Sequence, residues 1–339
     1  MTERINKRWR LAAYPEGMVD ESAFQYMEAP VLPPGDGQVL VKVIWLSVDP
    51  YVRGRMSPVK SYVEPMKVGQ TIAGQSVGQV LESRHPRFDK GDLVLGFTGW
   101  QSYAVMPGEE LEKVALRALK ASYALGVLGM PGLTAYFGLL EVGKAREGET
   151  VLVSGAAGAV GSTAGQIAKI KGCMVVGVAG SDEKARWLTE GLGFDAAVNY
   201  KAHPDLREAL GAACPNGVDV YFDNVGGTVS DAAIGLINQK ARIVVCGQIA
   251  HYNAKNPPRG PRILATLLVN RARAEGFIVY DFQQRFPTAM VELQRWMAEG
   301  RLKARETIIE GIENAPKAFL GLFEGANTGK LLVKVGEME

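Results

Sequence analysis

Between residues 150 and 247 the sequence alternates strictly between short apolar runs and segments with helical spacing. The first run, TVLVS at residues 150–154, carries no charge, which is typical of a strand buried on both faces of a sheet. Such regular alternation predicts a parallel, doubly wound α/β sheet. The expected strands are 150–154, 174–179, 196–200, 218–224 and 241–247, and the expected helices are 162–171, 182–190, 204–213 and 228–238.

The sequence before residue 126 has a different pattern, in which short β-rich runs are punctuated by glycine and proline. Because no long helical period appears there, this part predicts a separate β-rich domain. Near the C-terminus a helix is expected at 315–323 and a strand at 330–335, and this strand could return to the first domain. The β-rich runs are 38–48, 68–81, 92–97 and 102–106.

Charge and cysteine content exclude several classes of function. The chain has 38 Lys and Arg against 36 Asp and Glu, so its net charge of +2 lacks the basic character of proteins that bind nucleic acid or anionic membranes. The three cysteines, Cys173, Cys214 and Cys246, are odd in number and widely spaced. This spacing argues against a disulfide framework and against a structural zinc site.

One uncharged stretch, residues 121–140, is long enough to span a bilayer. It contains four glycines and a proline and has no basic flank, so it predicts two buried helices joined by a turn at 130–132. The N-terminal sequence MTERINKRWRL lacks the apolar core of a secretory signal. We therefore expect a cytoplasmic protein with no membrane partner.

A glycine-rich turn lies between the first strand and the first helix of the alternating region, with the sequence GAAGAVG at residues 155–161. In this context Gly155 and Gly158 allow the backbone to approach a pyrophosphate, and Gly161 allows the helix to pack closely on the strand. The helix that begins near Ala159 offers free N–H groups and the positive end of its dipole to phosphates. The turn predicts a dinucleotide site, and the alternative is a tight turn without a ligand.

The end of the second strand distinguishes NADP from NAD, because an NAD site usually places an acidic residue there to bind the ribose 2′-hydroxyl. Here the sequence is AGSDEK at residues 179–184, so small residues leave room for a 2′-phosphate and Lys184 supplies a positive charge. Ser181 also fits a helix cap, a role compatible with a phosphate on Lys184. Asp182 could instead bind the 2′-hydroxyl of NAD, but the pattern favours NADP.

The chain resembles a known family, the zinc-independent medium-chain dehydrogenase/reductases. The similar branch is that of prostaglandin and leukotriene reductases, plant 2-alkenal reductases and bacterial curcumin reductases. The likeness runs from about residue 35 to residue 335 and rests on several motifs in a fixed order. These motifs are SVDPYVR at 47–53, MPGLTAYFG at 130–138, AAGAVGS at 156–162, GSDEK at 180–184, YFDNVGG at 221–227 and GKL at 329–331.

The resemblance implies a GroES-like β-rich domain at residues 1–126, completed by about 310–339, and a Rossmann NADP-binding domain at 127–309, with the active site in the cleft between them. It implies NADPH-dependent reduction of the carbon–carbon double bond of α,β-unsaturated ketones and aldehydes, and a homodimer. Without the resemblance, Tyr200 could be a core tyrosine and Asn224 a strand-end cap. The cofactor positions that it implies are Ala156, Ala157, Gly158, Ala159, Val160, Gly161, Gly180, Ser181, Lys184, Tyr200, Asn224, Cys246, Gly247, Ile249, Tyr252, Phe277, Ile278, Val279 and Asn327.

Zinc alcohol dehydrogenases share this architecture, so the presence of a metal is an important question. Their Gly-His-Glu motif would fall within residues 69–78, where Gly74 and Gln75 replace the histidine and the acidic residue. No cysteine precedes Cys173, and the sequence therefore predicts no metal site. Without zinc, alcohol oxidation loses its Lewis acid, whereas conjugate reduction spreads the charge over an enolate and needs none.

An enolate still needs a hydrogen-bond donor. Tyr252 lies in the loop 247–253 that follows a sheet strand, and a phenol with an ordinary pKa near 10 is a donor at neutral pH. The alternative is a tyrosine that only covers the nicotinamide, and Tyr51 is the second candidate for a catalytic residue. Two other functions stay open, namely a quinone reductase of the same superfamily and a catalytically inactive nucleotide-binding protein.

Overall fold

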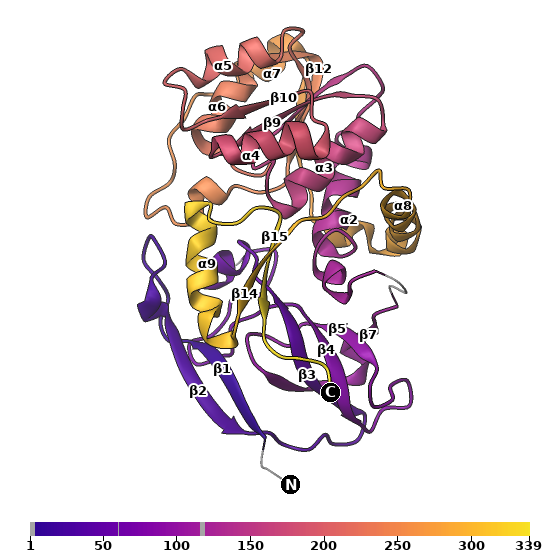
Figure 1. The fold of residues 1–339 in the computed structure, drawn as a ribbon. Helices are drawn as coiled ribbons and strands as arrows, with labels where there is room; N and C mark the ends of the chain where they lie inside the picture. Colours follow the sequence, from indigo (N-terminus) through magenta and orange to yellow (C-terminus); the bar gives the residue numbers. More distant parts are fainter. Residues whose placement is uncertain (1–3, 60, 116–118) are drawn as a thin grey trace. The chain divides into compact units, whose positions relative to one another are not determined.

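The computed structural model describes residues 4–59, 61–115 and 119–339, and the start of the N-terminal sequence discussed above lies outside them. The chain forms two compact units, which Figure 1 draws as ribbons. We call them the N-terminal unit and the central unit, and each is described by itself. The N-terminal unit comprises Met1–Leu125, Glu306–Asn327 and Leu331–Glu339, and the central unit comprises Gly126–Arg305 and Thr328–Lys330.

The central unit contains a six-stranded parallel sheet in the order β10-β9-β8-β11-β12-β13. The chain enters at β8 in the middle, builds outward to β10, and then returns to the other side of β8 to build outward to β13. This is a doubly wound sheet, and its strand order reverses between β8 and β11. The strands are β8 Thr150–Val153, β9 Met174–Ala179, β10 Ala196–Asn199, β11 Val218–Asp223, β12 Ile237–Val245 and β13 Arg273–Gly276.

Helices connect these strands and leave β8 buried at every position. Local capping begins two of them: the Ser181 hydroxyl accepts from the Lys184 backbone N–H, and the Asp205 carboxylate accepts from the Glu208 N–H. The helices of this unit are α2 Met130–Phe137, α3 Ala159–Ile170, α4 Asp182–Arg186, α5 Leu206–Ala213, α6 Gly227–Ile234, α7 Leu264–Asn270 and α8 Phe286–Ala298.

The N-terminal unit is β-rich, with a two-stranded ribbon and a seven-stranded sheet in which β6 branches from β3. Its core is aromatic: the Trp100 ring stacks on Phe24 at 5.8 Å and meets the edge of Phe319 at 5.6 Å. The predicted fold class, a β-rich domain with a Rossmann-type domain, is confirmed. The elements are β1 Ile5–Leu11, β2 Phe24–Pro30, β3 Gln38–Ser47, α1 Val52–Arg55, β4 Ser76–Ser83, β5 Leu93–Gly96, β6 Tyr103–Pro107, β7 Glu112–Lys113, β14 Glu306–Glu310, α9 Ala315–Glu324 and β15 Lys330–Lys334.

The predicted turn at residues 130–132 is wrong. Helix α2 begins at Met130, and Pro131 sits in its first turn, where the missing N–H of proline has no helical partner to lose. The chain turns earlier, between a 3₁₀ helix at Ala121–Leu125 and α2. Gly132 is tightly packed there, because a Cβ on it would lie 1.9 Å from the Val127 carbonyl oxygen.

Two further differences concern strands. The sequence did not predict the β1–β2 ribbon, since the consecutive polar residues 6–8 interrupt the alternation expected of a strand and β1 fully buries only Leu11. The predicted helix 228–238 ends at Ile234, and its last residues belong to β12, which begins at Ile237.

As for the uncharged stretch 121–140, no helix among the described residues has the length and apolar character that crossing a membrane requires.

Candidate dinucleotide and active site

The predicted cofactor positions of the central unit all follow the carboxyl ends of its parallel strands. They come after β8, β9, β10, β11, β12 and β13, so they share one edge of the sheet. The strand order reverses between β8 and β11, and ligands of open α/β sheets bind at such a reversal. The fold thus brings together segments that are more than 100 residues apart in the sequence.

The glycine-rich turn after β8 is closely packed. A Cβ on Gly161 would lie 2.4 Å from the Gly155 carbonyl oxygen, and one on Gly158 would lie 3.2 Å from the same atom. Gly155 has φ +57°, a conformation that favours glycine. The Gly329 N–H donates to the Ala157 carbonyl at 2.7 Å. The turn leads directly into α3, a helix of twelve residues. The first N–H groups of a helix have no partner within the helix, so those of α3 are available to an anion.

The ends of β9 and β10 form a corner around Gly180. The Tyr200 hydroxyl lies 3.4 Å from the point that a Cβ on Gly180 would occupy. Lys184, on α4, is partly buried, and its pKa is lowered first by burial and then by the charge of Lys201. Asp182 Oδ1 accepts a hydrogen bond from the Asn199 side-chain amide at 2.8 Å, so that oxygen already has a protein partner. This corner places basic and hydroxyl groups together around a residue without a side chain.

A buried carboxylate, Asp223, connects the strand ends on the two sides of the reversal. Its Oδ1 accepts from the Ser154 hydroxyl at the end of β8 and from the Gly226 N–H, both at 2.9 Å. Its Oδ2 accepts from the Ser230 hydroxyl on α6 at 2.7 Å and from the Gln248 side chain at 2.8 Å. Asp223 is 3% exposed, so it holds β8, β11, α6 and the loop after β12 in one network.

Asn224, the next residue, is held by the same network. Its backbone N–H donates to the Ser154 hydroxyl at 2.9 Å, and its side-chain amide donates to the Ser154 carbonyl at 2.7 Å. The strand-end role that the sequence left open for Asn224 is therefore present in the structure. In both of these bonds Asn224 is the donor, so its side-chain amide oxygen takes no part in them, which is compatible with a ligand contact.

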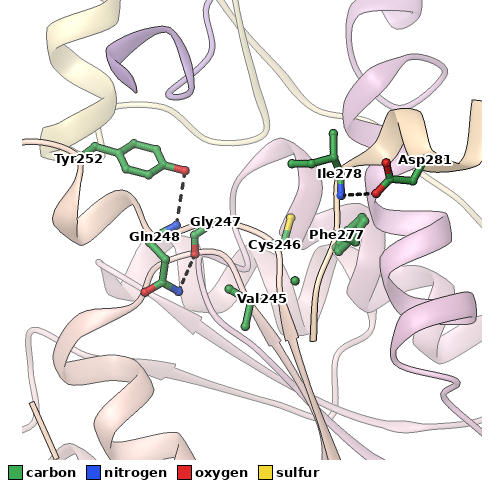
Figure 2. A pocket seen from close by; sticks show the side chains of 9 residues that line it. Val245, Cys246, Gly247, Gln248, Tyr252, Phe277, Ile278 and Asp281 are labelled. Atoms are coloured by element: carbon green, nitrogen blue, oxygen red, sulfur yellow. Dashed lines mark hydrogen bonds between the residues drawn. The ribbon is translucent and has the colours of Figure 1, made fainter. Parts of the chain in front are cut away.

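A hollow of about 430 Å³ opens beside the ends of β12 and β13 (Figure 2). Tyr252 and Cys246 reach it from one strand end, and Phe277 reaches it from the other. The Tyr252 hydroxyl oxygen accepts from the Gln248 backbone N–H at 3.4 Å, a bond that leaves the phenolic proton for another acceptor. The full lining is Val245, Cys246, Gly247, Gln248, Tyr252, Gly276, Phe277, Ile278 and Asp281.

Two titratable groups of this hollow are kept in their neutral forms. Burial raises the pKa of Tyr252, so its phenol is protonated at neutral pH and acts as a donor. Burial, with a smaller contribution from the charge of Asp223, raises the pKa of the Cys246 thiol to about 12. A protonated thiol is a poor nucleophile, so Cys246 lines the hollow without being reactive.

Four of the remaining predicted positions do not line the hollow. Tyr51 and Asn327 belong to the N-terminal unit, and the geometry of the central unit does not include them. Val279 is 7% exposed and does not line the hollow, and Ile249 begins a short 3₁₀ helix beside it. Sequence reasoning missed Gln248 and Asp281 as lining residues and Asp223 as the centre of the network. The signal for Asp223 was an acidic residue at the end of an apolar strand, three residues before the glycine pair Gly226-Gly227.

The position that carries a zinc ligand in related dehydrogenases is filled by packing. A Cβ on Gly74 would lie 2.7 Å from Cδ1 of the buried Trp100 indole, so a histidine could not be placed there without moving the ring. Throughout residues 4–59, 61–115 and 119–339, no group of three or more His, Cys, Asp or Glu side chains is arranged to hold a metal. The donor set of the zinc enzymes does not fit this chain.

The fold and the glycine-rich turn define a class of two-unit proteins that bind a dinucleotide at the edge of a doubly wound sheet. Residues 7–114 match the family described as N-terminal domain of oxidoreductase, and residues 159–295 match the family described as zinc-binding dehydrogenase. Together these matches cover most of the chain.

Three curated relatives and one solved structure are similar along almost the entire chain. The NADPH-dependent curcumin reductase of Escherichia coli is 47% identical, and prostaglandin reductase 1 of Bos taurus is 44% identical over 97% of this chain and 98% of its own. For the Escherichia coli protein the match covers 97% of each chain. The 2-alkenal reductase of Nicotiana tabacum is 43% identical over 99% of both chains. The crystal structure of CurA from Vibrio vulnificus in complex with NADPH is 43% identical, with a TM-score of 0.93 over 98% of this chain and 99% of that one.

The chain therefore belongs to the medium-chain dehydrogenase/reductases, in the zinc-independent branch that contains curcumin, prostaglandin and 2-alkenal reductases. The expected family membership is confirmed.

The Asp223 network gives a prediction for stability. In an Asp223→Asn variant, an amide N–H₂ replaces one acceptor and faces the donors that the carboxylate now satisfies. An unsatisfied buried donor costs about 1–3 kcal/mol, so we expect the free energy of unfolding to fall by that amount. Urea denaturation measures it, with the exposed Asp36→Asn as the matched control. A variant as stable as the wild type would show that the network does not hold the strand ends together.

Proposed function

We propose that the protein is an NADPH-dependent reductase of the carbon–carbon double bond of α,β-unsaturated ketones and aldehydes. The observation that carries this proposal is the hollow at the carboxyl edge, where a protonated Tyr252 phenol lies among the predicted cofactor positions Cys246, Gly247 and Phe277. The curcumin and 2-alkenal reductases named above support the same reaction class.

The residues present fit the dinucleotide. In the turn 155–161, a Cβ on Gly161 would meet the backbone of Gly155 and Ala156, so this position has space only for glycine. Lys184, on the helix that follows Gly180, supplies positive charge. The turn and the start of α3 would hold the pyrophosphate, and Lys184 and Tyr200 would hold the 2′-phosphate. When bound, NADPH supplies the hydride.

Tyr252 is the proposed donor to the substrate carbonyl oxygen. Negative charge develops on that oxygen when hydride reaches the β-carbon, and only interactions that are stronger at that stage raise the rate. The Gln248 N–H fixes the phenol oxygen and leaves its proton available. Because burial raises the pKa of Tyr252, the proton stays on the phenol at neutral pH. Tyr51, in the N-terminal unit, is the second candidate for this role.

A panel of substrates tests the proposed reaction. Purified protein is incubated with NADPH and enones, alkenals and quinones, and NADPH oxidation is followed by absorbance. We expect turnover of enones and alkenals with the double bond reduced and the carbonyl retained. Turnover of quinones alone would favour a quinone reductase. Cofactor binding without any turnover would favour an inactive nucleotide-binding protein.

A Tyr252→Phe variant tests the donor. Loss of one such donor typically costs about 10²–10³ in turnover, and because water can partly replace the hydroxyl we expect roughly a ten- to hundredfold lower kcat. NADPH affinity should stay unchanged because the ring remains. Tyr26→Phe, on the exposed β1–β2 ribbon, is the control and should keep full activity. Full activity of Tyr252→Phe together with loss in Tyr51→Phe would assign the donor to Tyr51.

We also propose that the protein is a homodimer formed through the edge of the central sheet. Strand β13 is exposed at every residue, and in the described part of the chain it pairs only with β12. Helix α7, which contacts β12, exposes Leu264, Leu268 and Val269 at 76%, 77% and 70%. An exposed edge strand flanked by apolar side chains is a template for pairing with a second chain.

Light scattering after size exclusion measures the oligomeric state. We expect a dimer for the wild type and a monomer for Leu268→Asp, because a charge would be buried in the interface. Val291→Asp, an equally exposed apolar position on α8, should remain a dimer. A monomeric wild type, or a Leu268→Asp variant that stays dimeric, would contradict the proposed interface.

The location that we propose is the cytoplasm. The three cysteines are free, and two of them are buried. Free thiols without a disulfide framework fit a reducing compartment.

A further inference from the structure

A second lysine reaches the corner around Gly180. Lys201 lies in the turn after β10, next to Tyr200. Its Cε is 3.5 Å from the point that a Cβ on Gly180 would occupy, and its ammonium nitrogen is 5.9 Å from the centre of the Tyr200 ring. The sequence motif that pointed to Lys184 did not include this residue, because it comes from a different strand end.

The two lysines are close enough to repel each other. The charge of Lys201 contributes to the lowered pKa of Lys184, after burial. Asp182, at the start of α4, accepts a hydrogen bond from Asn199. Glu183 lies 3.9 Å from Arg305, and its charge only partly offsets the lowering of the Lys184 pKa. Among the described residues, no carboxylate lies within ion-pair distance of the Lys201 ammonium. Two like charges placed together around a small residue are unfavourable unless an anion lies between them.

We propose that Lys201 is a second cation for the 2′-phosphate and thus a determinant of the preference for NADPH over NADH; this inference rests on the proposed cofactor site. A phosphate monoester carries a charge of about −1.5 to −2 at neutral pH, so a single lysine does not neutralise it. Lys184 binds from the α4 side and Lys201 from the β10 side. Gly180, between them, leaves space for the phosphate oxygens.

The two lysines contribute differently. Lys184 is partly buried, so its interaction with an anion is only weakly screened by salt. Lys201 is exposed, and its interaction is weaker and more sensitive to ionic strength. Removal of Lys201 should therefore lower the affinity for the phosphate in a salt-dependent way and leave the rest of the dinucleotide site unchanged.

A Lys201→Gln variant tests the inference. Dissociation constants for NADPH and NADH are measured by quenching of tryptophan fluorescence, at low and at high salt. We expect NADPH to bind about three- to tenfold more weakly at low salt, with unchanged NADH binding. The difference should shrink at high salt. The control is Lys240→Gln, which removes an exposed charge in the first half of β12, away from the carboxyl edge.

Displacement of bound NADPH by fragments separates this inference from the proposed cofactor site. The probes are 2′,5′-ADP and 5′-AMP, which differ by the 2′-phosphate. If the wild type binds 2′,5′-ADP no better than 5′-AMP, the proposed NADPH site itself is wrong. If the wild type prefers 2′,5′-ADP and Lys201→Gln keeps the same preference, only the role of Lys201 is overturned. A preference that falls in Lys201→Gln and is retained in Lys240→Gln supports the inference.

Discussion

The site depends on the hydrogen bonds that the buried carboxylate of Asp223 accepts. It is 3% exposed and accepts hydrogen bonds from the end of β8, from the turn after β11, from α6 and from the loop after β12. These segments are adjacent only because the strand order reverses between β8 and β11. A buried charge is tolerated when it is fully hydrogen-bonded, and here the bonds fix the segments that carry Asn224, Gln248 and Tyr252.

The second constraint is the lack of a side chain at two glycine positions along the carboxyl edge, Gly161 and Gly180. A Cβ on Gly161 would meet the backbone of the preceding turn, and Gly180 opens the corner that Tyr200, Lys184 and Lys201 surround. At the carboxyl edge of the sheet, a ligand can thus approach the backbone. Positive charge lies after β9 and β10, and the hollow lies at the ends of β12 and β13. A glycine in the N-terminal unit has the opposite effect. Trp100 fills the space next to Gly74 that the side chain of a zinc ligand would need.

Much of this could be predicted from the sequence, because the relevant signals are local. Alternation of apolar runs and helices predicted the doubly wound sheet, and the strand expected at 174–179 is β9 without any shift. The β1–β2 ribbon escaped prediction because its charged residues mask the period of a strand. The hydrogen bond of Asp223 to Ser154 joins residues 69 positions apart, and Lys201 and Lys184 come from different strand ends. Such pairings depend on strand order, which no local pattern contains.

Transfer of hydride to the β-carbon of an unsaturated carbonyl compound is the central claim. NADPH that carries deuterium at C4 of the nicotinamide tests it most directly, with the product of a simple enone examined by nuclear magnetic resonance and mass spectrometry. The account predicts one deuterium on the carbon β to an intact carbonyl group. Deuterium on the carbonyl carbon of an allylic alcohol, or a reduced product without deuterium, would contradict it.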